Sequence, residues 1–149
     1  MQSVAQRILG GENVAFIEAA GSGKTTALRE CLKYIDPSYG IISMFTTELS
    51  QFKNILYLSE DQGFNWTCPN WIHIVPETIL SNSKVTEQAL AAPGSLVTTI
   101  QVREPEDGED IVQLFHQRCD QLALDPAQFS VIVWACIRDG QHMTRIIYL

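Results

Sequence analysis

The sequence lacks several features that identify common classes of protein. No two of its four cysteines form a C-x-x-C pair, so a zinc site built on paired cysteines is not expected. The histidines share no spacing that is typical of metal ligands. The cysteines are Cys31, Cys68, Cys119 and Cys136, and the histidines are His73, His116 and His142. We also find no internal repeat and no low-complexity segment.

Long apolar runs and an excess of basic charge are also absent. No run approaches the length of a membrane span, and residues 1–7 are too polar for a secretory signal. These absences predict no membrane partner and a reducing location, either cytoplasmic or, in a eukaryote, nuclear. Ten basic residues face 17 acidic ones, for a net charge of −7. A broad nucleic-acid-binding surface is therefore disfavoured, whereas a local basic patch is not.

What is present is an alternation of apolar runs with helical patterns. The length of 149 residues suits a single domain, 1–149, with a possible internal boundary near 90–95 in the polar, alanine-rich segment 81–95. Strands are expected at 14–17, 40–45, 55–58, 71–75, 96–102, 129–134 and 144–149. Helices are expected at 2–9, 26–35, 76–80 and 109–124, with another beginning near 47. This alternation predicts an α/β fold with a mostly parallel central sheet flanked by helices.

The most informative segment is a glycine loop at residues 18–26, between the apolar run 14–17 and a helical pattern. Its small residues let the backbone N–H groups point inward at a helix N-terminus, where they attract phosphate oxygens. Lys24 is expected to reach the outer phosphates and Thr25 to offer its hydroxyl to Mg²⁺. The expected nucleotide-binding residues of this loop are Ala20, Gly21, Ser22, Gly23, Lys24, Thr25 and Thr26.

The glycine loop departs from the pattern G-x-x-x-x-G-K-[ST] at one position, because its first glycine is replaced by Glu18. The simpler alternative is a strand–helix turn that carries an exposed lysine. Against it, glycine and serine ahead of a helix lower stability unless something uses the bare backbone.

With Glu18 included, the loop resembles the E-A-x-A-G-S-G-K-T loop of UvrD/Rep-type superfamily 1 DNA helicases, which are P-loop NTPases with a RecA-like, three-layer architecture. Gln2 fits the family's adenine-reading Q-x-x-A motif, and Gln6 fits it less well. Phe45, Thr46 and Thr47 resemble the T-F-T motif that touches single-stranded DNA. The resemblance implies ATP and Mg²⁺ as cofactors and single-stranded DNA as a partner.

Other segments resemble the family more loosely. Residues 59–63 are similar to its D-E-x-Q-D motif, with Ser59 in place of the metal-binding aspartate. Glu60 then matches the water-orienting carboxylate, which makes Lys24 and Glu60 the implied catalytic residues, and Asp61 is a candidate metal ligand beside Thr25. The alternative is an ordinary strand that ends in an acidic turn. Residues 96–149 resemble the start of a second motor domain.

The departures from the family bear on turnover. Its transition-state arginine falls on Trp134, and the nearest substitutes are Arg103 and Arg138. Because an arginine at that position accelerates phosphoryl transfer about a thousandfold or more, hydrolysis is expected to be slow. Two hypotheses follow: an ATPase of superfamily 1 type linked to DNA, or a reduced nucleotide-binding module with a regulatory or assembly role. A protein partner that completes the ATP site is compatible with both.

A third possibility is a small P-loop kinase or GTPase. The sequence contains neither a lid with clustered arginines nor an N-K-x-D guanine motif. Among the tryptophans, Trp71 and Trp134 lie in apolar runs that predict core packing, and Trp66 alone is a candidate for stacking on a base. The acidic residues between 104 and 110 are expected to form a solvated turn and a helix start.

Overall fold

The structure is a computed structural model that describes residues 2–19, 28, 30–36, 38–43, 55–57, 71–136 and 142–147. Its labelled helices are α1 (Gln2–Leu9), α3 (Glu77–Leu80), α4 (Ser83–Ala91) and α5 (Ile111–Leu122), with the 3-10 turn η2 (Pro126–Gln128). The strands are β1 (Val14–Ala19), β2 (Gly40–Ser43), β3 (Ile55–Tyr57), β4 (Trp71–Ile74), β5 (Ser95–Val102), β6 (Ser130–Cys136) and β7 (His142–Ile147).

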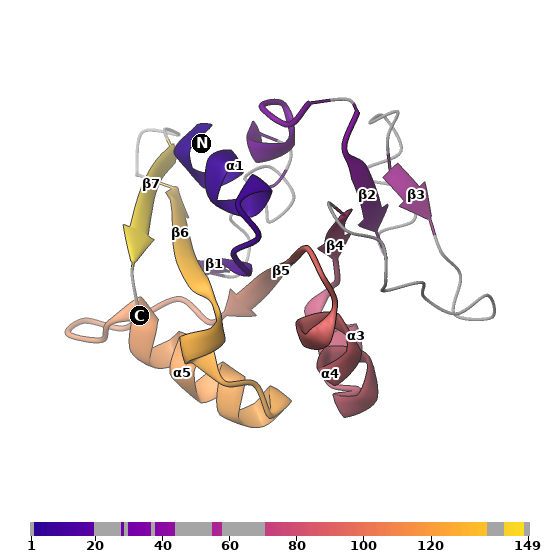
Figure 1. The fold of residues 1–149 in the computed structure, drawn as a ribbon. Helices are drawn as coiled ribbons and strands as arrows, with labels where there is room; N and C mark the ends of the chain where they lie inside the picture. Colours follow the sequence, from indigo (N-terminus) through magenta and orange to yellow (C-terminus); the bar gives the residue numbers. More distant parts are fainter. Residues whose placement is uncertain are drawn as a thin grey trace.

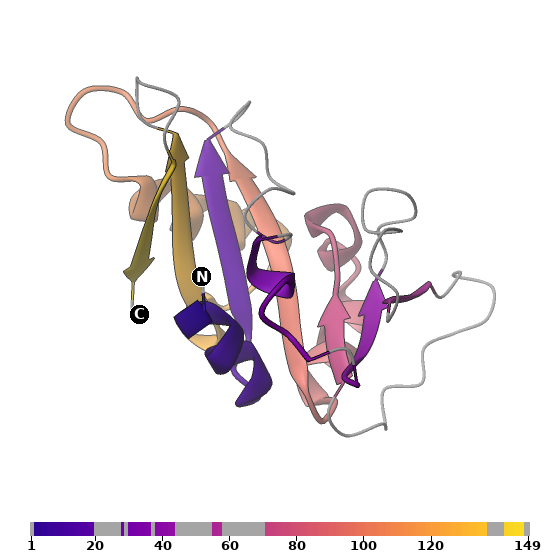
Figure 2. The same cartoon turned by 90° about the horizontal axis from the view of Figure 1, so that it is seen from above.

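The described strands form one seven-stranded sheet in the order β3-β2-β4-β5-β1-β6-β7. Neighbouring strands are parallel from β3 to β6, and only β7 runs antiparallel, against β6. Strands from both sides of the proposed boundary near 90–95 therefore alternate within one sheet. Figure 2 shows β1, β5 and β6 side by side, with their carboxyl ends at the same edge.

Helices cover both faces of the sheet (Figure 1). One face packs against α1 and against a helical segment after the glycine loop, which contributes Leu28, Cys31 and Leu32. The opposite face packs against α3, α4 and α5. Successive side chains of β1 alternate between the two cores, with Val14 and Phe16 in one and Ala15 and Ile17 in the other. This three-layer arrangement confirms the predicted α/β class.

Most elements agree with the sequence expectations, and α4 is the exception. Continuous apolar runs predicted the strands well because strands that are buried on both faces have no polar side. The sequence analysis predicts no helix in the segment 81–95, which contains α4. Its start is signalled by Asn82, whose side chain accepts a hydrogen bond from the Lys84 N–H at 3.1 Å. The helix was missed because only Thr86 and Ala89 are buried. No helix in the described ranges is long and apolar enough to span a bilayer.

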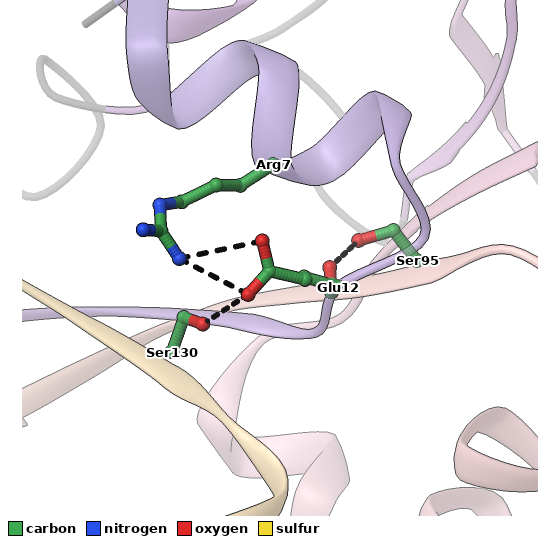
Figure 3. A network of polar contacts seen from close by, with 4 residues as sticks. All are labelled: Arg7, Glu12, Ser95 and Ser130. Carbon is green, nitrogen blue, oxygen red and sulfur yellow. Dashed lines mark hydrogen bonds and ion pairs between the residues drawn. The ribbon is translucent and has the colours of Figure 1, made fainter. Parts of the chain in front are cut away.

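Glu12 links α1 to the amino ends of three adjacent strands (Figure 3). Arg7 of α1 donates to both carboxylate oxygens of Glu12, at 3.1 and 3.3 Å. The Ser130 hydroxyl, at the start of β6, donates to Oε1 of Glu12 at 2.9 Å. The Ser95 hydroxyl, at the start of β5, donates to the backbone carbonyl of Glu12. One residue therefore aligns α1, β5, β1 and β6.

Asn13 makes a similar connection through its backbone and its side chain. Its Oδ1 accepts from the Leu96 N–H at 2.9 Å, and its carbonyl accepts from the Ser130 N–H at 2.8 Å. These bonds satisfy two donors at the ends of the neighbouring strands, where unpaired backbone groups are costly. The amino edge is thus fixed by polar contacts, and this sets the register of the three strands whose opposite ends form the candidate site.

His73 is a fully buried histidine in β4, with none of its surface exposed. It lies between Ile72 and Ile74, which are both core residues. Burial disfavours the charged imidazolium and lowers the pKa of His73 from its ordinary 6.5 to about 4. The folded protein therefore holds this side chain neutral at pH 5, where the unfolded chain protonates it.

We predict that this difference makes the protein less stable in mild acid. Because the folded-state pKa is the lower one, stability is lost as the pH falls from about 6.5 to about 4, by about 2 kcal/mol between pH 7 and pH 5. Urea unfolding at pH 7 and at pH 5 measures this difference in the free energy of unfolding. His73→Leu should remove most of this pH dependence, whereas His116→Gln, at an exposed position on α5, should leave it unchanged. If His73→Leu loses as much stability between pH 7 and pH 5 as the unaltered protein does, His73 is not the cause of the pH dependence.

Candidate functional site

The carboxyl ends of β1 and β5 form a topological switch point. The two strands are neighbours, and the chain leaves them toward opposite faces of the sheet. After β1 it enters the helical segment with Leu28 and Cys31, and after β5 it enters α5, which packs on the other face. Diverging connections of this kind leave a crevice at the sheet edge, where α/β proteins bind ligands.

The register of β1 and β5 places the start of the glycine loop at this crevice. Glu18 pairs with Gln101, and Ala19 pairs with Val102. The loop therefore begins level with the end of β5. Residues 20–26, which include Lys24 and Thr25, lie outside the described residues, as do Phe45, Thr46, Thr47, Glu60 and Asp61.

Gln101 lies beside the start of the loop and on the same face as the helix that follows it. Val97 belongs to the core that contains Leu28 and Cys31, whereas Leu96 and Ile100 belong to the opposite core. Because side chains alternate along a strand, Gln101 points to the side of Val97. Its side chain is only partly buried. An amide is therefore available next to the position where the glycine loop begins.

Glu77 supplies a partly buried carboxylate at the same edge of the sheet. It is the first residue of α3 and follows β4 after two residues. Its Oε2 accepts a hydrogen bond from the Gln101 backbone N–H at 3.1 Å, and its side chain is 15% exposed. The last described bond from this segment to β5 joins the Val75 N–H to the Val97 carbonyl. The Glu77 carboxylate therefore takes over as the partner of β5 where β4 has ended.

Arg118 of α5 approaches the same oxygen of Glu77. Its Nε lies 3.6 Å from Oε2, and its Nη1 donates to Oε1 of Gln121 at 2.9 Å. Among the described residues, no hydrogen bond to the other oxygen of Glu77, Oε1, is found. The closest polar contacts of the carboxylate are thus with one oxygen, from groups on β5 and α5.

Glu77 is not among the site residues that the sequence predicts. The pattern at 76–80 predicts only the start of a helix, and the predicted carboxylate follows the apolar run 55–58. The available signal was a carboxylate that directly follows the apolar run 71–75 and Pro76. The same pattern follows the run 55–58, so the order of the strands is needed to separate the two.

The connection between β5 and α5 is organised by a second arginine–glutamate pair. The guanidinium of Arg103 donates to both oxygens of Glu109, at 2.6 and 2.5 Å. This pairing, together with a hydrogen bond from the Glu106 N–H, lowers the pKa of Glu109 to about 2. The acidic turn at 104–110 is therefore a fixed loop that begins at the end of β5.

Gln2, the expected adenine-reading residue, is exposed at the start of α1. The alternative residue, Gln6, lines a shallow hollow of about 370 Å³ together with Ser3, Arg7, Gly10 and Glu12. Glu12 precedes β1 and the glycine loop follows it, so the six residues of β1 separate the hollow from the loop by about 20 Å. The hollow is therefore distinct from the crevice.

In the described part of the chain, no three His, Cys, Asp or Glu side chains are grouped so that they could hold a metal ion. Cys31 and Cys119 are free and buried, one in each core. Burial raises the pKa of the Cys31 thiol to about 12 and that of Cys119 to about 11. Both thiols are therefore protonated at neutral pH, as expected for core residues.

No family model and no curated protein matches this chain. Among solved structures, the crystal structure of the VirB11 ATPase from the Brucella suis type IV secretion system, in complex with sulphate, is similar, with a TM-score of 0.56 and 11% identity. The match covers 97% of this chain and 50% of that one, so the chain spans half of its neighbour's length. A likeness at this identity shows the fold alone, without the superfamily 1 type. The chain has the α/β fold of a P-loop NTPase, a mostly parallel sheet flanked by helices.

Proposed function

We propose that the chain binds ATP with Mg²⁺ at the glycine loop and hydrolyses it. The observation that carries this proposal is the position of the loop. The segment Gly-Ser-Gly-Lys-Thr-Thr begins two positions after Ala19, the last residue of β1, which lies at the crevice between β1 and β5. A backbone rich in N–H donors at a switch point is suited to bind phosphate groups.

The roles within the loop follow from its chemistry. The N–H groups of residues 20–26 would surround the phosphates, and Lys24 would neutralise charge on the outer ones. Thr25 would hold Mg²⁺, which neutralises phosphate charge when it is bound. Gln101, on the same face and one strand away, is positioned to meet the outer end of the nucleotide. The described residues fit this assignment because Gln101 and Glu77 place an amide and a carboxylate at this edge of the sheet.

The strand order favours Glu77 as the carboxylate of this site. Only β5 separates β4 from β1, so the end of β4 lies about 10 Å from the end of β1. β3, which precedes Glu60 and Asp61, is an edge strand and lies about 19 Å from β1. A carboxylate that orients the attacking water must lie beside the phosphates. We therefore assign this role to Glu77, with Glu60 as the alternative and Asp61 as a further candidate ligand of Mg²⁺.

ATP with Mg²⁺ should stabilise the protein in a thermal-shift experiment. At a concentration 100 times the dissociation constant, a ligand that binds only the folded state adds about 2.7 kcal/mol, or about 5–10 °C in a chain of this size. Lys24→Ala should remove most of this shift, because the outer phosphates lose their cation. Lys33→Ala, an exposed lysine paired with Glu30, is the matched control. Equal shifts in both variants would rule out the proposed site, and GTP and ADP test its selectivity.

Glu77→Gln should reduce ATP hydrolysis at least about 100-fold and leave ATP binding within about twofold, because an amide cannot accept a proton from water. The amide oxygen can still accept the Gln101 N–H, so the fold should be retained. Steady-state hydrolysis and thermal shift measure the two effects. Glu60→Gln and Asp61→Asn are the comparison variants. If Glu60→Gln abolishes turnover and Glu77→Gln does not, the carboxylate is Glu60.

Hydrolysis linked to single-stranded DNA is a second candidate. The observation that favours it is the segment Phe45-Thr46-Thr47, with Gln2 upstream. On this hypothesis a single-stranded oligonucleotide raises the rate of ATP hydrolysis severalfold, and Phe45→Ala removes the increase. If the rate of ATP hydrolysis does not change when DNA is added, the first proposal, ATP hydrolysis without a link to DNA, is the one that stands. If there is ATP binding without turnover, the protein is instead a nucleotide-binding module with a regulatory role, or a protein partner completes its site.

A further inference from the structure

Arg118 and Glu77 come from two helices, α5 and α3, that pack on the same face of the sheet. Glu77 begins α3 just after β4, whereas Arg118 lies in the third turn of α5. α5 packs on the face opposite to the helix that follows the glycine loop. Their contact therefore links α5 to the start of α3, at the end of β4.

The closest polar contacts of Glu77 are with one of its two carboxylate oxygens. Nε of Arg118 and the backbone N–H of Gln101 both approach Oε2, at 3.6 and 3.1 Å. Among the described residues, no hydrogen bond to Oε1 is found. A carboxylate that is held through one oxygen keeps lone pairs of the other for a water molecule.

The setting of the pair also favours a positioning role. The side chains are 15% exposed for Glu77 and 33% exposed for Arg118, so solvent screens this pair less than it screens the surface pair Lys33–Glu30, at 61% and 42%. Arg118 is itself oriented by Gln121, one turn further along α5. The arginine is thus held by its own helix while it contacts the carboxylate.

We propose that Arg118 is a positioning residue for hydrolysis: it orients Glu77 through Oε2, so that Oε1 faces the attacking water. This inference rests on the proposed function, because it requires ATP in the crevice. It also makes the orientation of Glu77 depend on α5, so that a displacement of α5 changes turnover without changing the phosphate-binding loop.

Arg118→Gln and Arg118→Lys test the proposal in the full chain. Arg118→Gln should lower kcat for ATP hydrolysis about tenfold with KM within about twofold, because a misoriented base affects the chemical step and leaves binding intact. Arg118→Lys should keep part of the rate, since a cation remains near Oε2. Lys33→Gln removes the surface ion pair with Glu30 and should leave kcat unchanged.

A double variant separates positioning from a general loss of stability. If Arg118 acts through Glu77, Glu77→Gln combined with Arg118→Gln should be no slower than Glu77→Gln alone. The proposal would be overturned if the double variant were slower than Glu77→Gln by the factor that Arg118→Gln alone costs. An unchanged kcat in Arg118→Gln would also overturn it. Amide hydrogen exchange gives a readout that needs no activity: exchange at the Gln101 N–H should become faster in Arg118→Gln, and an unchanged rate also overturns the proposal.

The result also distinguishes this inference from the function on which it depends. If the unaltered protein binds ATP and Lys24→Ala abolishes binding, but no hydrolysis occurs, the role of Arg118 is wrong and the binding site stands. If ATP does not bind at all, both are wrong. If hydrolysis depends on Glu60 and not on Glu77, the site stands and the role of Arg118 fails.

Discussion

The rest of the structure depends on the burial of β1 between two parallel neighbours and two helical layers. Its side chains from Val14 to Ile17 are at most 1% exposed. On one edge it pairs with β5 and on the other with β6, so both of its hydrogen-bonding edges are occupied. Such a strand has little freedom to shift its register, because a slip would move each side chain into the wrong core. The start of the glycine loop is fixed as a result.

The two edges of the sheet serve different purposes. At the amino edge, Glu12 and Asn13 satisfy donors from the neighbouring strands and from α1. At the carboxyl edge, the connections diverge and leave polar groups: Gln101 pairs with Glu18 at the start of the loop, and the carboxylate of Glu77 lies on the other side of β5. The contacts at the amino edge fix the position of β1. Because β1 extends from that edge to the carboxyl edge, they also help to fix the start of the glycine loop.

Much of the fold could be predicted from the sequence, because apolar runs and capping residues are local signals. β1 and β5 are continuous apolar stretches, and the glycine loop is recognisable by its composition. The order of the strands could not be predicted, since no local pattern indicates that residues 95–102 lie between β1 and β4. That order determines how far each candidate carboxylate lies from the end of β1, which is why Glu77 is not among the candidates that the sequence predicts. The fold itself is shared by P-loop proteins of many functions, so the helicase resemblance and the secretion ATPase are compatible with one architecture.

The position of β5 between β4 and β1 makes the central strand pairing non-local, which affects how the chain folds. Asn13 and Leu96, which meet at the amino edge, are 83 residues apart in the sequence. The central pairing is therefore highly non-local, and such topologies fold slowly because a long loop must close first. During synthesis, β1 lacks its first partner until β5, residues 95–102, has been made. Its apolar residues are then exposed, so the nascent chain is expected to need protection from aggregation at that stage.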